Sequence, residues 1–368
     1  MSAPAPAQTE PFRPLEAVAA PPPVDPVRSP VVRDLGDGTH LVTFAWRGAA
    51  ERVLVLVNTV SEGHRGDLAP ILMDRVPGSD LWHRTFRCPS DLRATYQFHP
   101  CDGPLDAADD AAWARVRRAA VPDPLNPHRL PSWIPGAVTS LLELPGAPPQ
   151  PWRDPRPGVP GGSLRTLDVA GRTVHAYLPP GDGPADLLVL LDGELWSGLV
   201  PIAPTLDNLL ADGRIGPTLA LLPESGGSRD ADLGGPAHAR FLAEDLPALA
   251  ARLRTPTGRR TIAGQSLGGY AAAAAALRHP DAFGTVIAQS GAFWTDGEAL
   301  TAAYAASPRQ PVRFRLQVGT HEWRLRPAVR RFHAVLRDRG YDADLAEYTG
   351  GHDLACWRGG LAEALARP

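Results

Sequence analysis

The sequence predicts a small antiparallel β-sandwich followed by a larger α/β domain with a mostly parallel sheet flanked by helices. Residues 31–122 contain short runs rich in Val, Thr and aromatic residues, separated by turn residues. Residues 163–368 alternate continuous apolar runs with amphipathic ones, which is typical of buried parallel strands between helices. The proline-rich residues 123–162 lie between the two patterns, and residues 1–30 are rich in Pro and Ala. We therefore expect two domains joined by a connector and preceded by a flexible arm.

The first domain is expected to contain several short strands, because β-type runs recur between turn signals such as Gly36-Asp37-Gly38 and Pro77-Gly78-Ser79. The predicted strands span residues 39–46, 52–57, 81–87 and 94–99. Strands at this spacing are typical of a sandwich of about 100 residues. In the connector, proline at such density is not expected in helix interiors or central strands.

The second domain is expected to place helices against a buried sheet. Its predicted strands span residues 172–178, 187–191, 218–222, 261–263, 286–289, 313–318 and 345–348. Its predicted helices span residues 202–211, 241–252, 268–278 and 327–339. This alternation of strand and helix indicates parallel strand pairing.

Composition excludes several classes of function. The chain of 368 residues carries 37 Lys and Arg against 40 Asp and Glu, a formal net charge of −3, so we expect neither nucleic acid nor a membrane as a partner. It contains no lysine, which excludes a Schiff-base or P-loop lysine. Cys88, Cys101 and Cys356 are too few and too scattered for a disulfide scaffold or a structural zinc site. Because we find neither a signal peptide nor an apolar run of spanning length, we expect a cytoplasmic protein.

The clearest local motif is Gly264-Gln265-Ser266-Leu267-Gly268, between a predicted strand and an alanine-rich predicted helix. A G-x-S-x-G sequence in this setting forms a tight turn that exposes a nucleophilic serine at the carboxyl edge of a sheet. The two glycines allow close packing of the turn against neighbouring backbone. We therefore expect Ser266 to be a nucleophile. The competing interpretation is a serine that merely caps a helix.

The motif requires an acid and then a histidine further along the chain. His352, directly after the last predicted strand, is expected to be the general base. Glu322 follows the sixth predicted strand of the second domain and is expected to orient His352 and stabilise its charged form. Glu322 could instead be a surface residue or pair with an arginine. His321 is the strongest rival to His352, His238 is disfavoured because it precedes Ser266, and Asp353 is too close to His352 in sequence to reach its ring.

Backbone N–H groups are expected to stabilise the oxyanion that forms when a serine attacks an ester carbonyl. Leu267 directly follows Ser266, at the start of the predicted helix, and Gly193 and Glu194 follow the predicted strand at 187–191. In this class of site one donor follows the nucleophile and the other follows an earlier central strand. The alternative for Asp192-Gly193 is a plain β-turn.

Five short sequences accompany this arrangement in the second domain. They are Leu191-Asp192-Gly193-Glu194-x-Trp196, Ala263-Gly264-Gln265-Ser266-x-Gly268-Gly269, Gln289-Ser290-Gly291-x-Phe293-Trp294, Gly319-x-x-Glu322, and Gly350-Gly351-His352-Asp353-x-x-Cys356-Trp357-Arg358-Gly359-Gly360-Leu361. With these motifs the chain resembles the enterochelin (enterobactin) esterase family, which implies an α/β-hydrolase preceded by an immunoglobulin-like domain. The connector sequences at 123–127 and 140–145, and the first-domain residues Trp46, Tyr96 and Phe98, are similar to that family as well.

The resemblance implies a serine esterase that hydrolyses the trilactone ester bonds of a ferric catecholate siderophore and so releases iron in the cytoplasm. It implies no cofactor, since iron enters only as part of the substrate. A bulky anion with aromatic rims favours arginine and aromatic contacts, and the candidates are Arg229, Trp196, Arg324, Trp357 and Arg358. Each of these could instead be a solvated arginine or a core tryptophan.

Other functions stay open at this stage. The same residues would serve a carboxylester hydrolase or acyltransferase that acts on a non-siderophore ester. A protein that only binds the siderophore would show affinity without turnover. Residues 223–236 and 297–311 depart from the family pattern, which leaves the preferred ester undecided, and the sequence predicts no oligomeric state.

Overall fold

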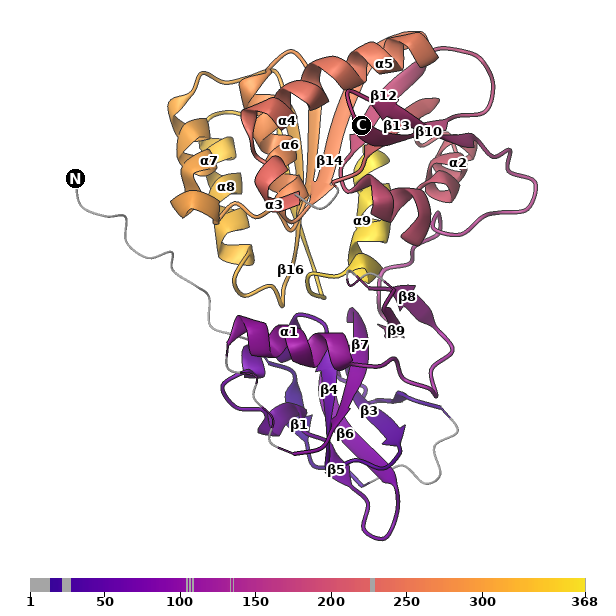
Figure 1. Ribbon diagram of the computed structural model, residues 1–368, viewed down its shortest axis with the longest axis vertical. Coiled ribbons are helices and arrows are strands. Elements are labelled where there is room, and N and C mark those ends of the chain that lie inside the picture. The colour runs from indigo at the N-terminus through magenta and orange to yellow at the C-terminus, as the bar shows by residue number, and fades with distance from the viewer. Residues whose placement is uncertain are drawn as a thin grey trace, which may run out of the picture.

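The computed structural model describes residues 14–21, 28–103, 105, 107, 109–132, 134, 136–225 and 229–367. Two antiparallel sheets form the N-terminal part of these residues, and an eight-stranded mixed sheet forms the C-terminal part. Figure 1 shows the two parts stacked along the long axis of the molecule.

The two N-terminal sheets share one apolar core. The first has the order β1-β6-β3-β2, with β5 paired to β6, and the second has the order β4-β7-β9-β8. The strands of the first are β1 (Glu16–Val18), β2 (Val31–Asp34), β3 (Thr39–Arg47), β5 (Asp74–Arg75) and β6 (Leu81–Pro89). Those of the second are β4 (Arg52–Val57), β7 (Arg93–Cys101), β8 (Arg129–Pro131) and β9 (Val138–Glu143). The core includes Phe44 and Phe86 from the first sheet and Val55, Tyr96 and Phe98 from the second.

Helix α1 (Asp110–Ala119) closes this core on the side that faces the large sheet (Figure 1). Asp109 caps the helix by accepting the N–H of Ala112 at 2.7 Å, and Trp113 and Val116 insert into the core. Two short 3₁₀ turns, η1 (Val60–His64) and η2 (Ala69–Ile71), follow β4.

The predicted strands of the first domain coincide with β3, β4, β6 and β7, but the structure adds elements that the sequence did not predict. Strand β1 lies within the predicted arm and pairs with β6; residues 1–13 and 22–27 of that arm lie outside the described residues. Strands β8 and β9 lie within the predicted connector and complete the second sheet. Proline is compatible with β8 because that strand is at the sheet's edge.

The large sheet has the strand order β10-β11-β13-β12-β14-β15-β16-β17. Its strands are β10 (Ser163–Val169), β11 (Arg172–Leu178), β12 (Ala185–Leu190), β13 (Thr218–Pro223), β14 (Pro256–Gln265), β15 (Thr285–Gln289), β16 (Arg313–Gly319) and β17 (Ala343–Tyr348). Strands β12 to β17 pair in parallel, whereas β10 and β11 are antiparallel. The carboxyl ends of β12, β14, β16 and β17 therefore meet at one edge, where ligands bind in open α/β sheets.

Helices cover both faces of this sheet. They are α2 (Ala203–Ala211), α3 (Arg229–Asp232), α4 (Pro236–Arg240), α5 (Leu246–Leu253), α6 (Leu267–Arg278), α7 (Thr295–Ala306), α8 (Arg326–Asp338) and α9 (Leu354–Leu365), with short π-helical turns η3 (Leu195–Leu199) and η5 (Phe241–Asp245). One core contains side chains of α5, α6 and α8, and another contains side chains of α2 and α9. The alanines at 271–276 are all buried, so α6 can approach the sheet closely. Among the described residues no helix is long and apolar enough to cross a membrane.

Candidate active site

Ser266 lies between β14 and α6 in a strained backbone conformation, with φ 55° and ψ −122°. Residues other than glycine rarely adopt a positive φ, and such strain is concentrated at functional sites. The Ser266 N–H donates to the Gln289 carbonyl at 2.9 Å, which fixes the turn to β15. An N-cap residue has an extended backbone and a side chain that accepts an N–H, but Ser266 has neither feature. The helix-cap interpretation is therefore wrong.

The turn is packed so closely that Gly264 has no room for a side chain and Gly268 has little. A Cβ on Gly264 would lie 2.4 Å from the Gly268 carbonyl, and a Cβ on Gly268 would lie 3.2 Å from Oδ2 of Asp192. The second distance also shows that the turn after β12 lies directly against the serine turn. The close packing expected of the motif is thus present.

Glu322 and His352 lie together at the carboxyl ends of β16 and β17. Nδ1 of His352 is 2.7 Å from Oε2 of Glu322, whose side chain is 0% exposed. The other oxygen, Oε1, accepts hydrogen bonds from Ser290 Oγ at 2.6 Å, from the Gly319 N–H at 2.7 Å and from the Tyr348 hydroxyl at 3.2 Å. Glu322 is therefore not a surface residue, because it is buried among donors that hold it against the imidazole.

Two aromatic residues support this pair. Burial, reinforced by the nearby Glu322 carboxylate, raises the pKa of Tyr348 well above its ordinary value, so its hydroxyl keeps its proton. Trp357 is fully buried, packs edge-on against the His352 ring at 4.6 Å between centroids, and donates to Ser290 Oγ at 3.0 Å. The substrate contact predicted for Trp357 is therefore not supported, because its indole is enclosed behind His352.

Asp353 has a separate role. Its Oδ1 accepts the Ala355 N–H at 2.9 Å and caps α9, while its Oδ2 accepts the Thr95 N–H at 2.6 Å. Both oxygens are thus engaged away from the imidazole, in agreement with the expectation that Asp353 is not its partner. The rival histidine His321 donates its backbone N–H to the Gly350 carbonyl at 3.0 Å.

The turn after β12 carries the predicted oxyanion donors Gly193 and Glu194. A Cβ on Gly193 would lie 2.2 Å from the Leu222 carbonyl oxygen, so only glycine fits there. Leu267 is the first residue of α6, where backbone N–H groups have no partner within the helix. Because β12 pairs with β14, both segments lie at the same edge of the sheet. Their function as oxyanion donors stays a prediction.

Asp192, at φ 60°, anchors this turn and was not among the predicted site residues. Its buried carboxylate accepts Arg229 Nε at 2.6 Å, Arg229 Nη2 at 2.9 Å and Ser225 Oγ at 2.8 Å. The bidentate pair occupies the guanidinium that we expected to bind substrate. Arg229 thus holds the turn after β12 through Asp192. The one sequence feature that could have identified Asp192 as a site residue is its position directly after a buried strand.

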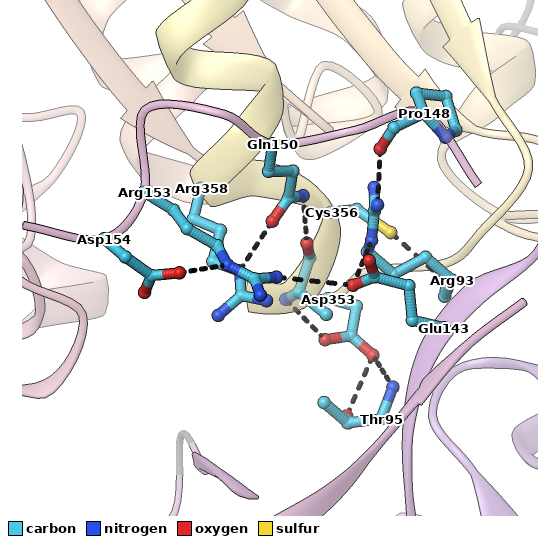
Figure 2. A network of polar contacts seen from close by, with 11 residues as sticks. Arg93, Thr95, Glu143, Pro148, Gln150, Arg153, Asp154, Asp353, Cys356 and Arg358 are labelled. Atoms are coloured by element: carbon cyan, nitrogen blue, oxygen red, sulfur yellow. Dashed lines mark hydrogen bonds and ion pairs between the residues drawn. The ribbon is translucent and has the colours of Figure 1, made fainter. Parts of the chain in front are cut away.

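Trp196 and Arg358 are also placed differently from the prediction. Trp196 is 1% exposed and donates to Oε1 of the buried Gln265 at 3.0 Å. Arg358 donates to Gln150 Oε1 at 2.8 Å and faces the connector (Figure 2). Burial, with the nearby Arg153 charge, lowers the pKa of Arg358 to about 10. Trp196 is therefore enclosed in the protein and the half-buried Arg358 pairs with the connector, so the substrate contacts predicted for them are not supported.

A buried glutamine ladder crosses the sheet beneath the serine turn and was missed by sequence reasoning. Gln265 Nε2 donates to Gln289 Oε1 at 2.9 Å, and Gln289 Nε2 donates to Gln317 Oε1 at 2.6 Å. Gln289 Nε2 also lies 3.0 Å from the Trp357 carbonyl. The ladder satisfies buried amides and connects the strand that bears Ser266 to helix α9. The recurrence of glutamine near the ends of β14, β15 and β16 was the only sequence feature that could have revealed the ladder.

Two exposed aromatic or cationic groups are available near the ends of β15 and β16. Arg324 is exposed, with its guanidinium 4.6 Å from the centroid of the Trp323 ring. Trp294 is 54% exposed, although we did not predict it as a site residue.

Within the described part of the chain, no group of three or more His, Cys, Asp or Glu is arranged to hold a metal ion.

The mostly parallel sheet, the strained serine turn and the buried carboxylate–imidazole pair define the class of protein as an α/β-hydrolase. Residues 41–153 match the family model described as the N-terminal domain of enterochelin esterase, and residues 170–367 match a model described as a putative esterase. The chain is 31% identical to the iron(III) enterobactin esterase of Escherichia coli K12, over 90% of this chain and 92% of that protein. It belongs to the enterobactin (enterochelin) esterase family and is an esterase.

Other relatives agree with this assignment. The iron(III) salmochelin esterase of Escherichia coli O6:H1 is 29% identical, over 88% of this chain and 86% of that protein. The crystal structure of the Shigella flexneri enterobactin esterase in the presence of enterobactin superposes with a TM-score of 0.79 at 27% identity, over 92% of this chain and 95% of that one. The ferric enterobactin esterase of Salmonella typhimurium gives a TM-score of 0.78, over 93% and 96%.

Proposed function

We propose that this protein hydrolyses the trilactone ester bonds of a ferric catecholate siderophore of the enterobactin type, with Ser266 as nucleophile. The observation that carries the proposal is the strained Ser266 turn at the same sheet edge as the His352–Glu322 pair. The curated relatives named as iron(III) enterobactin and salmochelin esterases support the choice of substrate.

In the proposed acylation step, Ser266 Oγ attacks an ester carbonyl as its proton passes to Nε2 of His352. Glu322 lies against Nδ1, so it holds the tautomer that leaves Nε2 free and stabilises the imidazolium that forms. The amides of Leu267, Gly193 and Glu194 are proposed to stabilise the oxyanion. His352 then gives the proton to the alkoxide of the substrate, which leaves. In the second half of the reaction, water attacks the acyl-Ser266 ester with the same help from His352 and releases the acid product.

Arg324, Trp323 and Trp294 are proposed to form the surface that binds the siderophore. Arg324 keeps an exposed positive charge, and Trp294 exposes an aromatic face at the end of the adjacent strand β15. A ferric tris-catecholate is an anion with aromatic edges, so guanidinium and indole groups match its chemistry. Arg324 is thus the predicted substrate-binding residue that the geometry favours.

Three further features belong to the proposal. Iron is proposed to enter only within the substrate, with no resident cofactor, and the reaction is proposed to take place in the cytoplasm, without membrane or nucleic-acid partners. The N-terminal sheets are proposed to form an immunoglobulin-like domain, a description supported by two antiparallel sheets that share one core.

The proposal is tested by comparing kcat/KM for ferric enterobactin with kcat/KM for a simple aryl ester such as 4-nitrophenyl acetate. We expect kcat/KM to be at least about a hundredfold higher for the ferric siderophore, because only that substrate is large enough to contact the proposed binding surface of Arg324, Trp323 and Trp294. Rapid cleavage of the aryl ester with intact trilactone would instead favour a carboxylester hydrolase or acyltransferase for non-siderophore esters. Tight binding of ferric enterobactin without cleavage of either ester would indicate a binding protein.

A further inference from the structure

The loop that carries His352 is fastened to the first domain through its backbone. The His352 N–H donates to Thr59 Oγ1 at 2.7 Å, and Asn58 Nδ2 donates to the His352 carbonyl at 3.0 Å. Both backbone groups of the histidine are thus satisfied by side chains almost 300 positions earlier in the chain. The preceding residues, Gly350 and Gly351, have no side chain with which to stiffen the loop.

The loop also passes in direct contact with the first domain. A Cβ on Gly351 would lie 2.6 Å from the Cβ of Thr59, and a Cβ on Gly350 would lie 2.8 Å from the Arg93 carbonyl oxygen. The glycines therefore allow the loop to approach close enough for the two hydrogen bonds to form.

Thr59 adopts a backbone conformation that is unfavourable for a β-branched residue, with φ 65° and ψ −48°. The surrounding structure enforces it, because the Asn58 N–H donates to the Thr95 carbonyl at 2.9 Å and the Glu62 N–H donates to the Thr59 carbonyl at 3.2 Å. Strained backbone conformations of this kind cluster at functional sites. At Thr59 the strained conformation places the side-chain hydroxyl where it accepts the hydrogen bond from the His352 N–H.

The residue after the histidine is fastened to the same domain. Asp353 Oδ2 accepts both the N–H and the hydroxyl of Thr95, at 2.6 and 2.8 Å, and Cys356 Sγ lies 3.3 Å from the Arg93 carbonyl (Figure 2). These contacts hold the start of α9. The Asn58 and Thr59 contacts are the ones that act on His352 itself.

A cavity of about 300 Å³ adjoins the contact and is lined in part by Asn58, Thr59, Thr95 and Asp353. The cavity borders Asp353 and Leu354 rather than residues 350–352, which contact Thr59 directly. The two hydrogen bonds and this contact therefore hold the loop that carries His352 against the first domain.

We infer that Asn58 and Thr59 of the first domain are positioning residues for the proposed general base. Glu322 sets the orientation of the imidazole ring, and the Asn58–Thr59 pair sets the position of the backbone that bears it. A displacement of about 1 Å in a catalytic group can lower a rate by about a hundredfold. The inference rests on the proposed function of His352 and extends it, since esterase activity then depends on a contact between the domains.

The test uses the full-length chain and compares Thr59→Val with Thr59→Ser. Valine keeps the β-branched shape at the strained position but removes the acceptor, whereas serine keeps the hydroxyl. With 4-nitrophenyl acetate, we expect Thr59→Val to lower kcat by at least about tenfold with KM within about twofold of wild type. Thr59→Ser should stay within about threefold of wild type in kcat.

Thr43→Val is the matched control, because it removes a hydroxyl that lies 2.8 Å from Thr85 Oγ1 between β3 and β6, away from His352. The rate at which a fluorophosphonate labels Ser266 should fall in parallel with kcat for Thr59→Val and stay unchanged for Thr43→Val. Thermal unfolding shows whether each variant is folded. If Thr59→Val does not fold, Asn58→Ala is expected to show the same loss of kcat.

A folded Thr59→Val variant with wild-type kcat would overturn the inference while leaving the proposed function intact, and so would equal losses in Thr59→Val and Thr43→Val. If Thr59→Val is unfolded and Asn58→Ala keeps wild-type kcat, the inference is also overturned. A wild-type protein unable to cleave the aryl ester or ferric enterobactin would instead refute the proposed function, and the inference with it.

Discussion

Nδ1 of His352 lies 2.7 Å from Oε2 of Glu322, and the two residues come from loops that follow adjacent strands of the large sheet. The glutamate is fully buried, and its other oxygen already accepts three hydrogen bonds. Oε2 is thus directed to the imidazole by a surrounding set of donors. This arrangement gives His352 a fixed orientation before any substrate arrives.

Replacing Ser266 with alanine should abolish turnover while leaving affinity for ferric enterobactin nearly unchanged. The nucleophile contributes to the transition state but little to ground-state binding, so kcat should fall by about 10⁴-fold or more. Steady-state kinetics and a direct binding titration check the two parts. Retained turnover would show that another residue is the nucleophile.

Replacing Glu322 with glutamine should lower kcat by about 10³-fold. The amide keeps the shape but places a donor or a neutral oxygen where the imidazolium needs a carboxylate. Ser290→Ala is the matched control, since it removes one donor to Oε1 but keeps the Oε2 contact, and should cost less than about tenfold. Comparable losses for both variants would contradict a specific role of Oε2.

Replacing Arg229 with alanine should reduce kcat for small and large esters alike, by about tenfold or more, because the turn that bears Gly193 loses its anchor. Loss of the guanidinium also leaves the Asp192 carboxylate buried without its bidentate partner, at a cost of about 3 kcal/mol in unfolding free energy. Kinetics on 4-nitrophenyl acetate and chemical denaturation measure these effects. A rise in KM for ferric enterobactin alone would instead return Arg229 to the substrate surface.

Replacing Arg324 with alanine should give the opposite pattern. Its exposed guanidinium is proposed to attract the anionic siderophore, so KM for ferric enterobactin should rise by about five- to tenfold. Cleavage of the neutral aryl ester should be unaffected. A loss with the neutral ester would mean that Arg324 maintains the structure of the site.

His238 should make the protein less stable in mild acid. Burial, aided by the Arg172 charge, lowers its pKa from the ordinary 6.5 to about 4, and neither ring nitrogen has a hydrogen-bond partner in the described structure. The unfolded chain therefore binds a proton more readily than the folded one, and stability falls as the pH drops from about 6.5 towards 4. Between pH 7.5 and pH 5 this group should remove about 2 kcal/mol.

Denaturation of wild type and a His238→Leu variant at the two pH values measures that contribution. The variant should lose about 2 kcal/mol less than wild type over the same interval. Identical pH dependence in the two proteins would show that His238 does not titrate in this way.

The parallel strands of the large sheet were predictable because buried parallel strands are continuous apolar runs, and β13 and β16 begin where the sequence predicted. The antiparallel edge strand β10 was not predicted. Helix α9 was not predicted, since Gly359 and Gly360 interrupt its pattern and glycine is unfavourable in helices. The structure supplies the reason for these glycines. A Cβ on Gly359 would lie 2.4 Å from Gln150 Nε2, and a Cβ on Gly360 would lie 2.4 Å from Gln317 Oε1.

In the candidate site, too, some features could be predicted from the sequence and others could not. Ser266, Glu322 and His352 follow predicted strands, so topology alone brings them to one edge of the sheet. The substrate contacts predicted for Trp196, Trp357 and Arg229 were not supported, because burial and pairing depend on neighbours that are distant in sequence. Asn58 and Thr59 carry no local pattern that connects them to a histidine almost 300 residues later.

In the proposed function, Ser266 cleaves the ester bonds of a catecholate trilactone. The most direct measurement is mass spectrometry of the products after ferric enterobactin is incubated with wild type and with Ser266→Ala. We expect linear trimer, dimer and monomer from wild type and intact trilactone from the variant. Intact trilactone from a folded wild-type protein, or the same products from both proteins, would contradict the proposed function.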